Sequence, residues 1–197
     1  MSDKETIKVY AAKANEYAAM TDDDGADDPM LAAFIAAIPP NGHVLDLGCG
    51  PGASANKMAQ AGLQVTATDA VPEMVALAER FAVVTATCAS FEDISGEDIY
   101  DGIWANFSLL HAPKKDMPRH LAALSKALKP NGLFHIGMKE GSGEKRDGIG
   151  RQYSYYELDE LTALLADAGL SAKEHTSGCA MGLDGTMANW ICVQAYG

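Results

Sequence analysis

Apolar positions along the chain follow two alternating patterns. Runs of about four to eight apolar and β-branched residues are typical of buried strands, whereas apolar residues three or four apart indicate helices. Strand patterns cover residues 44–47, 63–68, 82–87, 99–105 and 133–138, with a last pair near 171–176 and 187–195. Helical patterns separate them at 53–61, 72–80, 121–128 and 158–168. This alternation predicts an α/β fold with a parallel sheet and right-handed crossovers.

The residues before the first strand are helical in pattern. Residues 7–18 predict an amphipathic helix, and residues 30–38 predict a short apolar helix that Pro39 and Pro40 end. Between them, the acidic stretch 22–29 predicts a solvated turn that caps the second helix. We therefore expect one domain over residues 1–197, with an N-terminal helical cap at 1–40 and a core at 41–197.

Composition narrows the classes of partner. The chain has 15 Lys and Arg against 27 Asp and Glu, a formal net charge of -12, and this charge disfavours nucleic acids and anionic membranes. No apolar run approaches the roughly 18 residues of a membrane span, and no signal-peptide pattern is visible, so we expect a cytoplasmic protein. The four cysteines have no metal-ligand spacing, so no metal is expected. A monomer and a homodimer both remain open.

A glycine-rich turn joins the first strand to the following helix. Gly48, Gly50 and Ala53 fit the pattern of dinucleotide-binding turns, and Asp69 follows at the distance expected of a ribose-binding acid. Glycines there let a ligand approach the backbone, and the helix directs free N–H groups towards it. The pattern alone is compatible with a nicotinamide-dependent oxidoreductase and with other nucleotide-binding proteins.

The longer run Asp46-Leu47-Gly48-Cys49-Gly50-Pro51-Gly52 resembles the first motif of class I S-adenosylmethionine (SAM)-dependent methyltransferases. In that family the acid lies near the methionine end of SAM, where a carboxylate attracts the ammonium and sulfonium but would repel a pyrophosphate. Residues 101–113 and 128–134 resemble the fourth motif and the fifth strand of the same family. The resemblance implies a Rossmann-like seven-stranded sheet in the order 3-2-1-4-5-7-6, with strand 7 antiparallel and helices on both faces.

Ligands of such a sheet gather at the carboxyl ends of its strands. Asp69 either accepts hydrogen bonds from the ribose hydroxyls or caps the next helix, and Val71 and Met74 either flank adenine or belong to the core. Many members of the family have an aspartate where this chain has Ser90, so we expect backbone groups around Ala89 and Phe91 to contact adenine, while the Phe91 ring is equally compatible with a packing role. The predicted cofactor-binding residues are Tyr17, Asp46, Gly48, Cys49, Gly50, Asp69, Val71, Met74, Ala89, Ser90, Phe91, Asn106 and Phe107.

The acceptor side is predicted from the loops after the fourth and fifth strands. His111 is either the catalytic base or a residue that caps the following helix. Lys139, Arg151 and Tyr153 are candidates to bind an acidic substrate. The glycine-rich segment 139–151 is expected to be mobile, and it is either a lid over the acceptor or a plain surface loop.

The resemblance implies transfer of a methyl group from SAM to an O, N or S nucleophile of an unidentified small molecule, with S-adenosylhomocysteine as the product. The Asn/Asp-Pro-Pro-Tyr/Phe signature of enzymes that methylate amino groups of nucleic acids is absent, which favours a small acceptor. Two alternatives remain: a non-catalytic SAM-binding module and a nicotinamide-dependent oxidoreductase.

Overall fold

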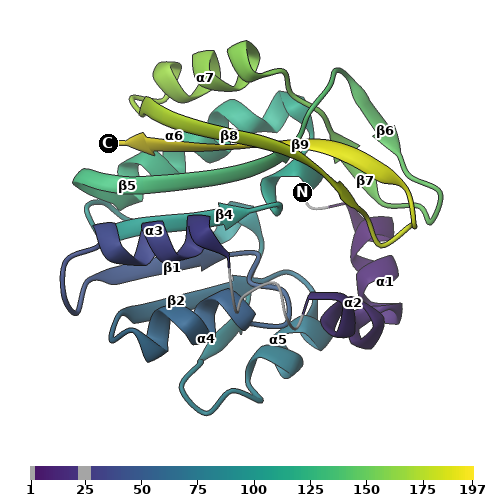
Figure 1. The fold of residues 1–197 in the computed structure, drawn as a ribbon, viewed down its shortest axis with the longest axis horizontal. Coiled ribbons are helices and arrows are strands. Elements are labelled where there is room, and N and C mark those ends of the chain that lie inside the picture. Colours follow the sequence, from purple (N-terminus) through teal and green to yellow (C-terminus); the bar gives the residue numbers. More distant parts are fainter. Residues whose placement is uncertain (1–2, 22–27) are drawn as a thin grey trace.

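The computed structural model describes residues 3–21 and 28–197, in which a twisted sheet lies between helices (Figure 1). Within these residues the main sheet has seven strands in the order β3-β2-β1-β4-β5-β9-β8. They are β1 (His43–Leu47), β2 (Gln64–Asp69), β3 (Ala86–Cys88), β4 (Tyr100–Asn106), β5 (Leu128–Lys139), β8 (Ser171–Met181) and β9 (Met187–Tyr196). The first five are parallel, and β9 pairs antiparallel with both β5 and β8. Since β8 and β9 are the sixth and seventh strands of this sheet, the predicted order and the antiparallel seventh strand are confirmed.

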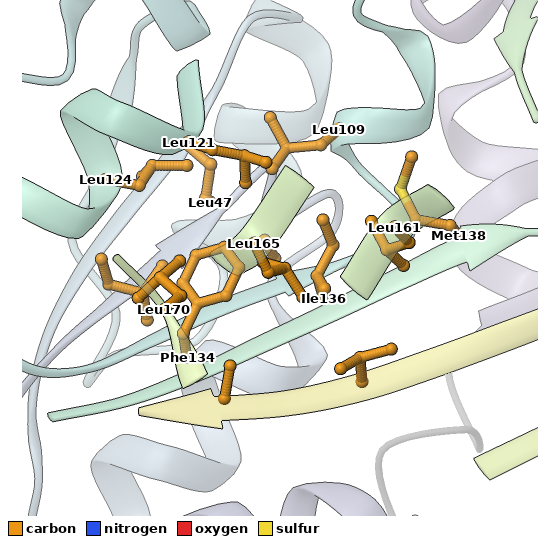
Figure 2. Packing of buried hydrophobic residues seen from close by; sticks show 14 of the residues in the cluster. Leu47, Leu109, Leu121, Leu124, Phe134, Ile136, Met138, Leu161, Leu165 and Leu170 are labelled. Carbon is orange, nitrogen blue, oxygen red and sulfur yellow. The ribbon is translucent and has the colours of Figure 1, made fainter. Parts of the chain in front are cut away.

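Helices cover both faces of the sheet, as predicted. They are α1 (Lys4–Ala12), α2 (Ala14–Thr21), α3 (Pro29–Ala37), α4 (Ala53–Gln60), α5 (Pro72–Ala78), α6 (Met117–Ala127) and α7 (Leu158–Asp167). On one face, Phe34 of α3 and Met58 of α4 share a buried cluster with Val44. On the other, Figure 2 shows Leu121 of α6 and Leu165 of α7 gathered with Ile136 of β5. Consecutive strand residues point to opposite faces, so a central strand buried on both sides is apolar throughout.

Two segments differ from the sequence expectation. The third strand is shorter than 82–87, because residues before it make turn hydrogen bonds and Val83 is 57% exposed at the edge of the sheet. The segment 139–151, expected to be an irregular mobile loop, instead contributes β6 (Glu144–Arg146), which pairs with β7 (Gln152–Ser154) as an antiparallel hairpin. Two ion pairs accompany the hairpin. Arg146 of β6 pairs with Asp3, which precedes α1, and Arg151 pairs with Asp147 in the loop between the two strands.

The N-terminal helices lie in two places. The predicted helix at 7–18 is divided at Lys13 into α1 and α2, and both pack against α5 beside the carboxyl ends of the strands (Figure 1). In contrast, α3 packs on the sheet. Asp28 caps α3 by accepting hydrogen bonds from the N–H groups of Met30 and Leu31, whereas residues 22–27 of the predicted turn lie outside the described residues. No helix in the described part of the chain is both long and apolar enough to cross a bilayer.

Candidate functional site

The turn between β1 and α4 is built from glycines in the left-handed region. Gly48, Gly50 and Gly52 have φ of 72°, 53° and 89°, which side chains with a Cβ rarely adopt. The N–H groups of Gly48 and Cys49 donate to the carbonyl of Thr68, each at 2.8 Å. This joins the turn to the end of β2, where Asp69 lies, so the two predicted binding elements share one rigid corner.

Asp46 is a buried carboxylate without a full set of partners. It is 3% exposed, and its Oδ2 has no hydrogen-bond partner among the described residues. Burial raises the pKa of Asp46 to about 7, the negative charge of Asp69 adds to this, and the N–H of Ala55 opposes it. A buried acceptor left unpaired costs free energy, so a protonated amine at this position would stabilise the ionised carboxylate.

Asp69 closes the other side of the corner. Its Oδ2 accepts the N–H of Gly50 at 2.9 Å, and its Oδ1 accepts the N–H of Val71 at 2.8 Å. No side chain caps α5, whose N-cap position is Val71, so Asp69 shapes the loop before the helix instead of capping it. Each carboxylate oxygen has a second lone pair, so both can still accept a ligand hydroxyl. Burial raises the pKa of Asp69.

Three neighbouring hollows open at this edge of the sheet in the described residues, and Tyr17 and Phe107 line all of them. The first, which we call the nucleoside pocket, is bounded by α1, α2 and the ends of β1, β2 and β4. Predicted residues that line it are Tyr17, Gly48, Gly50, Asp69, Val71, Met74, Ala89, Phe91, Asn106, Phe107 and His111. Its walls suit a nucleobase with a ribose at Asp69.

The second hollow, the amine pocket, contains Asp46 and Cys49 and shares Gly48, Gly50 and Asn106 with the nucleoside pocket. The nucleoside pocket and the amine pocket therefore adjoin around the glycine turn. Tyr17 lies close to this turn, because a Cβ added to Gly50 would be 3.6 Å from its ring. Ser90 lines neither hollow. Its hydroxyl and N–H are both bonded to Asp93 in a capping box, so the structure places only its neighbours Ala89 and Phe91 at the nucleoside pocket.

Asn106 ends β4 between the two pockets, and a residue that sequence reasoning missed orients it. His135 Nε2 lies 3.2 Å from Asn106 Oδ1, and the imidazole stacks on Trp104 with centroids 3.8 Å apart. Burial lowers the pKa of His135 to about 3, so the ring is neutral and its Nε2–H donates to Asn106. The sequence did contain a sign of this role, because His135 is a polar residue within the otherwise apolar strand 133–138.

His111 lies at the site, but its basic nitrogen is occupied. Nδ1 donates to the carbonyl of Gln152 at 2.6 Å, which leaves Nε2 to accept the hydroxyl of Tyr10 at 3.0 Å. Burial lowers the pKa of His111 to about 4, so the imidazole is neutral near pH 7. In the sequence, Tyr10 is only one position of the amphipathic helix at 7–18. In the structure it lines two of the hollows, beside His111 in the first, and its hydroxyl also accepts a hydrogen bond from Arg151 Nη1 at 2.9 Å.

The third hollow, the acceptor pocket, brings together all three predicted substrate-binding residues, Lys139, Arg151 and Tyr153. Arg151 differs from the expectation of a loop cation free to bind an anion. It is 2% exposed, and Asp147 lies 2.8 Å from its Nε and Nη2. The Arg151 charge is thus already compensated inside the protein.

Among the residues described, no three His, Cys, Asp or Glu side chains are grouped as a metal site requires. The four cysteines all fall within the described ranges and are free, with Cys49 and Cys192 buried and Cys88 and Cys179 exposed.

Comparisons with known proteins agree with this geometry. Residues 44–132 match the family model of the methyltransferase domain. The ubiquinone biosynthesis O-methyltransferase of Xanthomonas campestris is 32% identical over 142 residues, 64% of this chain and 57% of the relative. The trans-aconitate 2-methyltransferase of Delftia acidovorans is 34% identical over 136 residues, 64% of this chain and 48% of the relative. The chain thus spans about half the length of these curated relatives.

Solved structures share the fold. The Burkholderia thailandensis 1,6-didemethyltoxoflavin-N1-methyltransferase, with 1,6-didemethyltoxoflavin and S-adenosylhomocysteine bound, gives a TM-score of 0.71 at 23% identity, covering 96% of this chain and 87% of that one. The methyltransferase in a Haloferax volcanii complex with its Trm112 activator gives 0.76 at 18% identity, covering 97% and 96%. In the sequence of residues 44–132 and in the strand order of its sheet, the chain is similar to class I SAM-dependent methyltransferases.

Proposed function

We propose that this protein transfers a methyl group from SAM to an O, N or S nucleophile of a small molecule. The observation that carries the proposal is Asp46, a buried carboxylate with an unpaired oxygen in the amine pocket. A protonated α-amino group supplies the missing donor, whereas the pyrophosphate of a nicotinamide cofactor would meet two carboxylates, Asp46 and Asp69, at the same corner. This favours SAM over the dinucleotide alternative.

The residues present fit SAM along its length. Asp46 would hold the amine of SAM, and the turn at Gly48 and Gly50 would let its methionine part pass close to the protein backbone. Asp69 would accept hydrogen bonds from the ribose hydroxyls. When bound, SAM supplies a sulfonium whose methyl carbon bonds to the electron pair of the nucleophile while its bond to sulfur breaks, which leaves neutral S-adenosylhomocysteine. The contribution of the protein is then placement of the nucleophile in line with that bond.

The acceptor pocket adjoins the nucleoside pocket through Tyr10, Tyr17 and Phe107. His111 lines the nucleoside pocket but not the acceptor pocket, and its Nε2 accepts a hydrogen bond from the hydroxyl of Tyr10, which lines both. We therefore assign Tyr10 as the polar group facing the acceptor and His111 as the residue that orients it. The net charge of -12 supports a small acceptor over a nucleic acid.

Calorimetric titration separates the three functional alternatives. We expect S-adenosylhomocysteine to bind and NAD not to bind. Tritium transfer from labelled SAM to a panel of small hydroxy, amino and thiol compounds then separates an enzyme from a non-catalytic module. Binding of NAD without S-adenosylhomocysteine would overturn the proposal, and binding of S-adenosylhomocysteine with no transfer to any class would favour the non-catalytic module.

A further inference from the structure

The acceptor pocket is walled mainly by aromatic and apolar side chains. Tyr17, Phe107, Leu110, Tyr153, Leu183 and Trp190 line it. The rings of Phe107 and Trp190 meet edge to face, with centroids 6.2 Å apart and planes at 80°. Rings that are held against one another offer flat faces for stacking at small entropic cost. The walls therefore favour a flat, largely apolar acceptor.

Two cations line this pocket, and their surroundings differ. Arg151 is paired with Asp147, as described above. Lys139 lies at the end of β5, with Nζ 3.9 Å from the centroid of the Tyr153 ring. Its ammonium makes no ion pair or hydrogen bond with any residue that the structure describes. The carboxylates that influence it are occupied elsewhere: Asp147 by Arg151, and Asp184 by the N–H and hydroxyl of Thr186.

Lys139 is also only partly open to water. Burial lowers its pKa, and the nearby positive charge of Arg151 acts in the same direction. A half-buried ammonium without a carboxylate partner is in a costly position, which an incoming anion relieves. Tyr153 stabilises the ammonium by its ring face but leaves its three N–H donors unused.

We propose that the acceptor is a flat, apolar molecule with one anionic oxygen, either a carboxylate or a phenolate, which pairs with Lys139 Nζ in the acceptor pocket. This inference rests on the proposed function, because it assumes that the pocket beside the nucleoside pocket receives the acceptor. Of the predicted substrate-binding residues Lys139, Arg151 and Tyr153, the inference selects Lys139 as the partner of the anion, because Arg151 already pairs with Asp147 within the protein.

The test is calorimetric titration of the protein saturated with S-adenosylhomocysteine, using pairs of probes that differ in charge. Benzoate against benzamide and 2-naphthoate against 2-naphthamide test a carboxylate, and 4-nitrophenolate against 4-nitroanisole tests a phenolate. We expect at least one anion to bind roughly tenfold or more tightly than its neutral partner, the scale of a charge-assisted hydrogen bond. The pair that shows this preference identifies the source of the oxygen.

Lys139→Met should abolish the preference for the anion while leaving S-adenosylhomocysteine affinity unchanged, and Lys139→Arg should retain part of the preference. Lys145→Met is the matched control, because Lys145 also lies over a tyrosine ring, that of Tyr155 at 4.8 Å, but does not line the acceptor pocket. Equal binding of each anion and its neutral partner, or an unchanged preference in Lys139→Met, overturns the inference. Failure of S-adenosylhomocysteine to bind at all is a different result and overturns the proposed function.

Discussion

Asp46 makes cofactor binding depend on pH. Its pKa is raised to about 7 by burial and by Asp69, and a ligand ammonium requires the ionised form. Below this pKa the ligand must displace a proton before it binds, so the apparent affinity should fall as pH falls. For a single group with pKa about 7, the dissociation constant is about tenfold higher at pH ~6 than at pH ~8, or about 1.4 kcal/mol. His111 and His135, with pKa about 4 and about 3, stay neutral throughout this interval.

The assay is calorimetric titration with S-adenosylhomocysteine, which carries the same amine but no transferable methyl group. Titrations at pH ~6 in two buffers of different ionisation enthalpy should report release of about 0.9 proton per ligand bound, and almost none at pH ~8. Asp46→Asn should remove both the proton release and most of the pH dependence, and any dependence that survives reports Asp69. A wild-type affinity that is constant over this interval, without proton release, would refute an ionised Asp46 as the partner of the amine.

Three further variants test other parts of the site. Asp69→Ala should weaken S-adenosylhomocysteine binding roughly 10- to 100-fold by calorimetry, with thermal unfolding followed alongside because Asp69 also accepts from Gly50; unchanged affinity would leave Asp69 with a structural role only. Gly50→Val should abolish binding in a protein that is folded by circular dichroism, because a β-branched residue is strained at φ 53°, and retained binding would move the cofactor elsewhere. Arg151→Ala should lower stability by about 3–5 kcal/mol in denaturant unfolding, since it leaves Asp147 buried and uncompensated, whereas a change under about 1 kcal/mol would show that the pair matters little.

Local patterns in the sequence predicted most helices and strands of the core, whereas the order of the strands came from the family resemblance. Parallel strands buried on both faces are apolar runs, and the glycines at the first turn indicate positive φ before any coordinates are known. In contrast, the β6–β7 hairpin contacts distant parts of the chain, as in the ion pair of Arg146 with Asp3. No local pattern encodes that pairing, so the segment resembled a loop.

The same distinction applies to the site. Strand ends identified Asp46, Asp69 and Asn106 because topology alone brings such ends together. Sequence could not show that Arg151 has an internal partner while Lys139 lacks one, since both are cations in one glycine-rich segment. Tyr10 was missed because a tyrosine on the buried side of a helix has the same periodicity as any packing residue.

The contacts between α1 and the β6–β7 hairpin link the walls of the two ligand pockets. Asp3, the N-cap of α1, pairs with Arg146, the Thr6 hydroxyl accepts the N–H of Gln152 at 2.8 Å, and Tyr10 accepts from Arg151. Three positions along α1 and its cap therefore contact residues 146–152. The same helix roofs the nucleoside pocket and contributes Tyr10 to the acceptor pocket. A displacement of α1 would therefore change the walls of the nucleoside pocket and of the acceptor pocket at the same time.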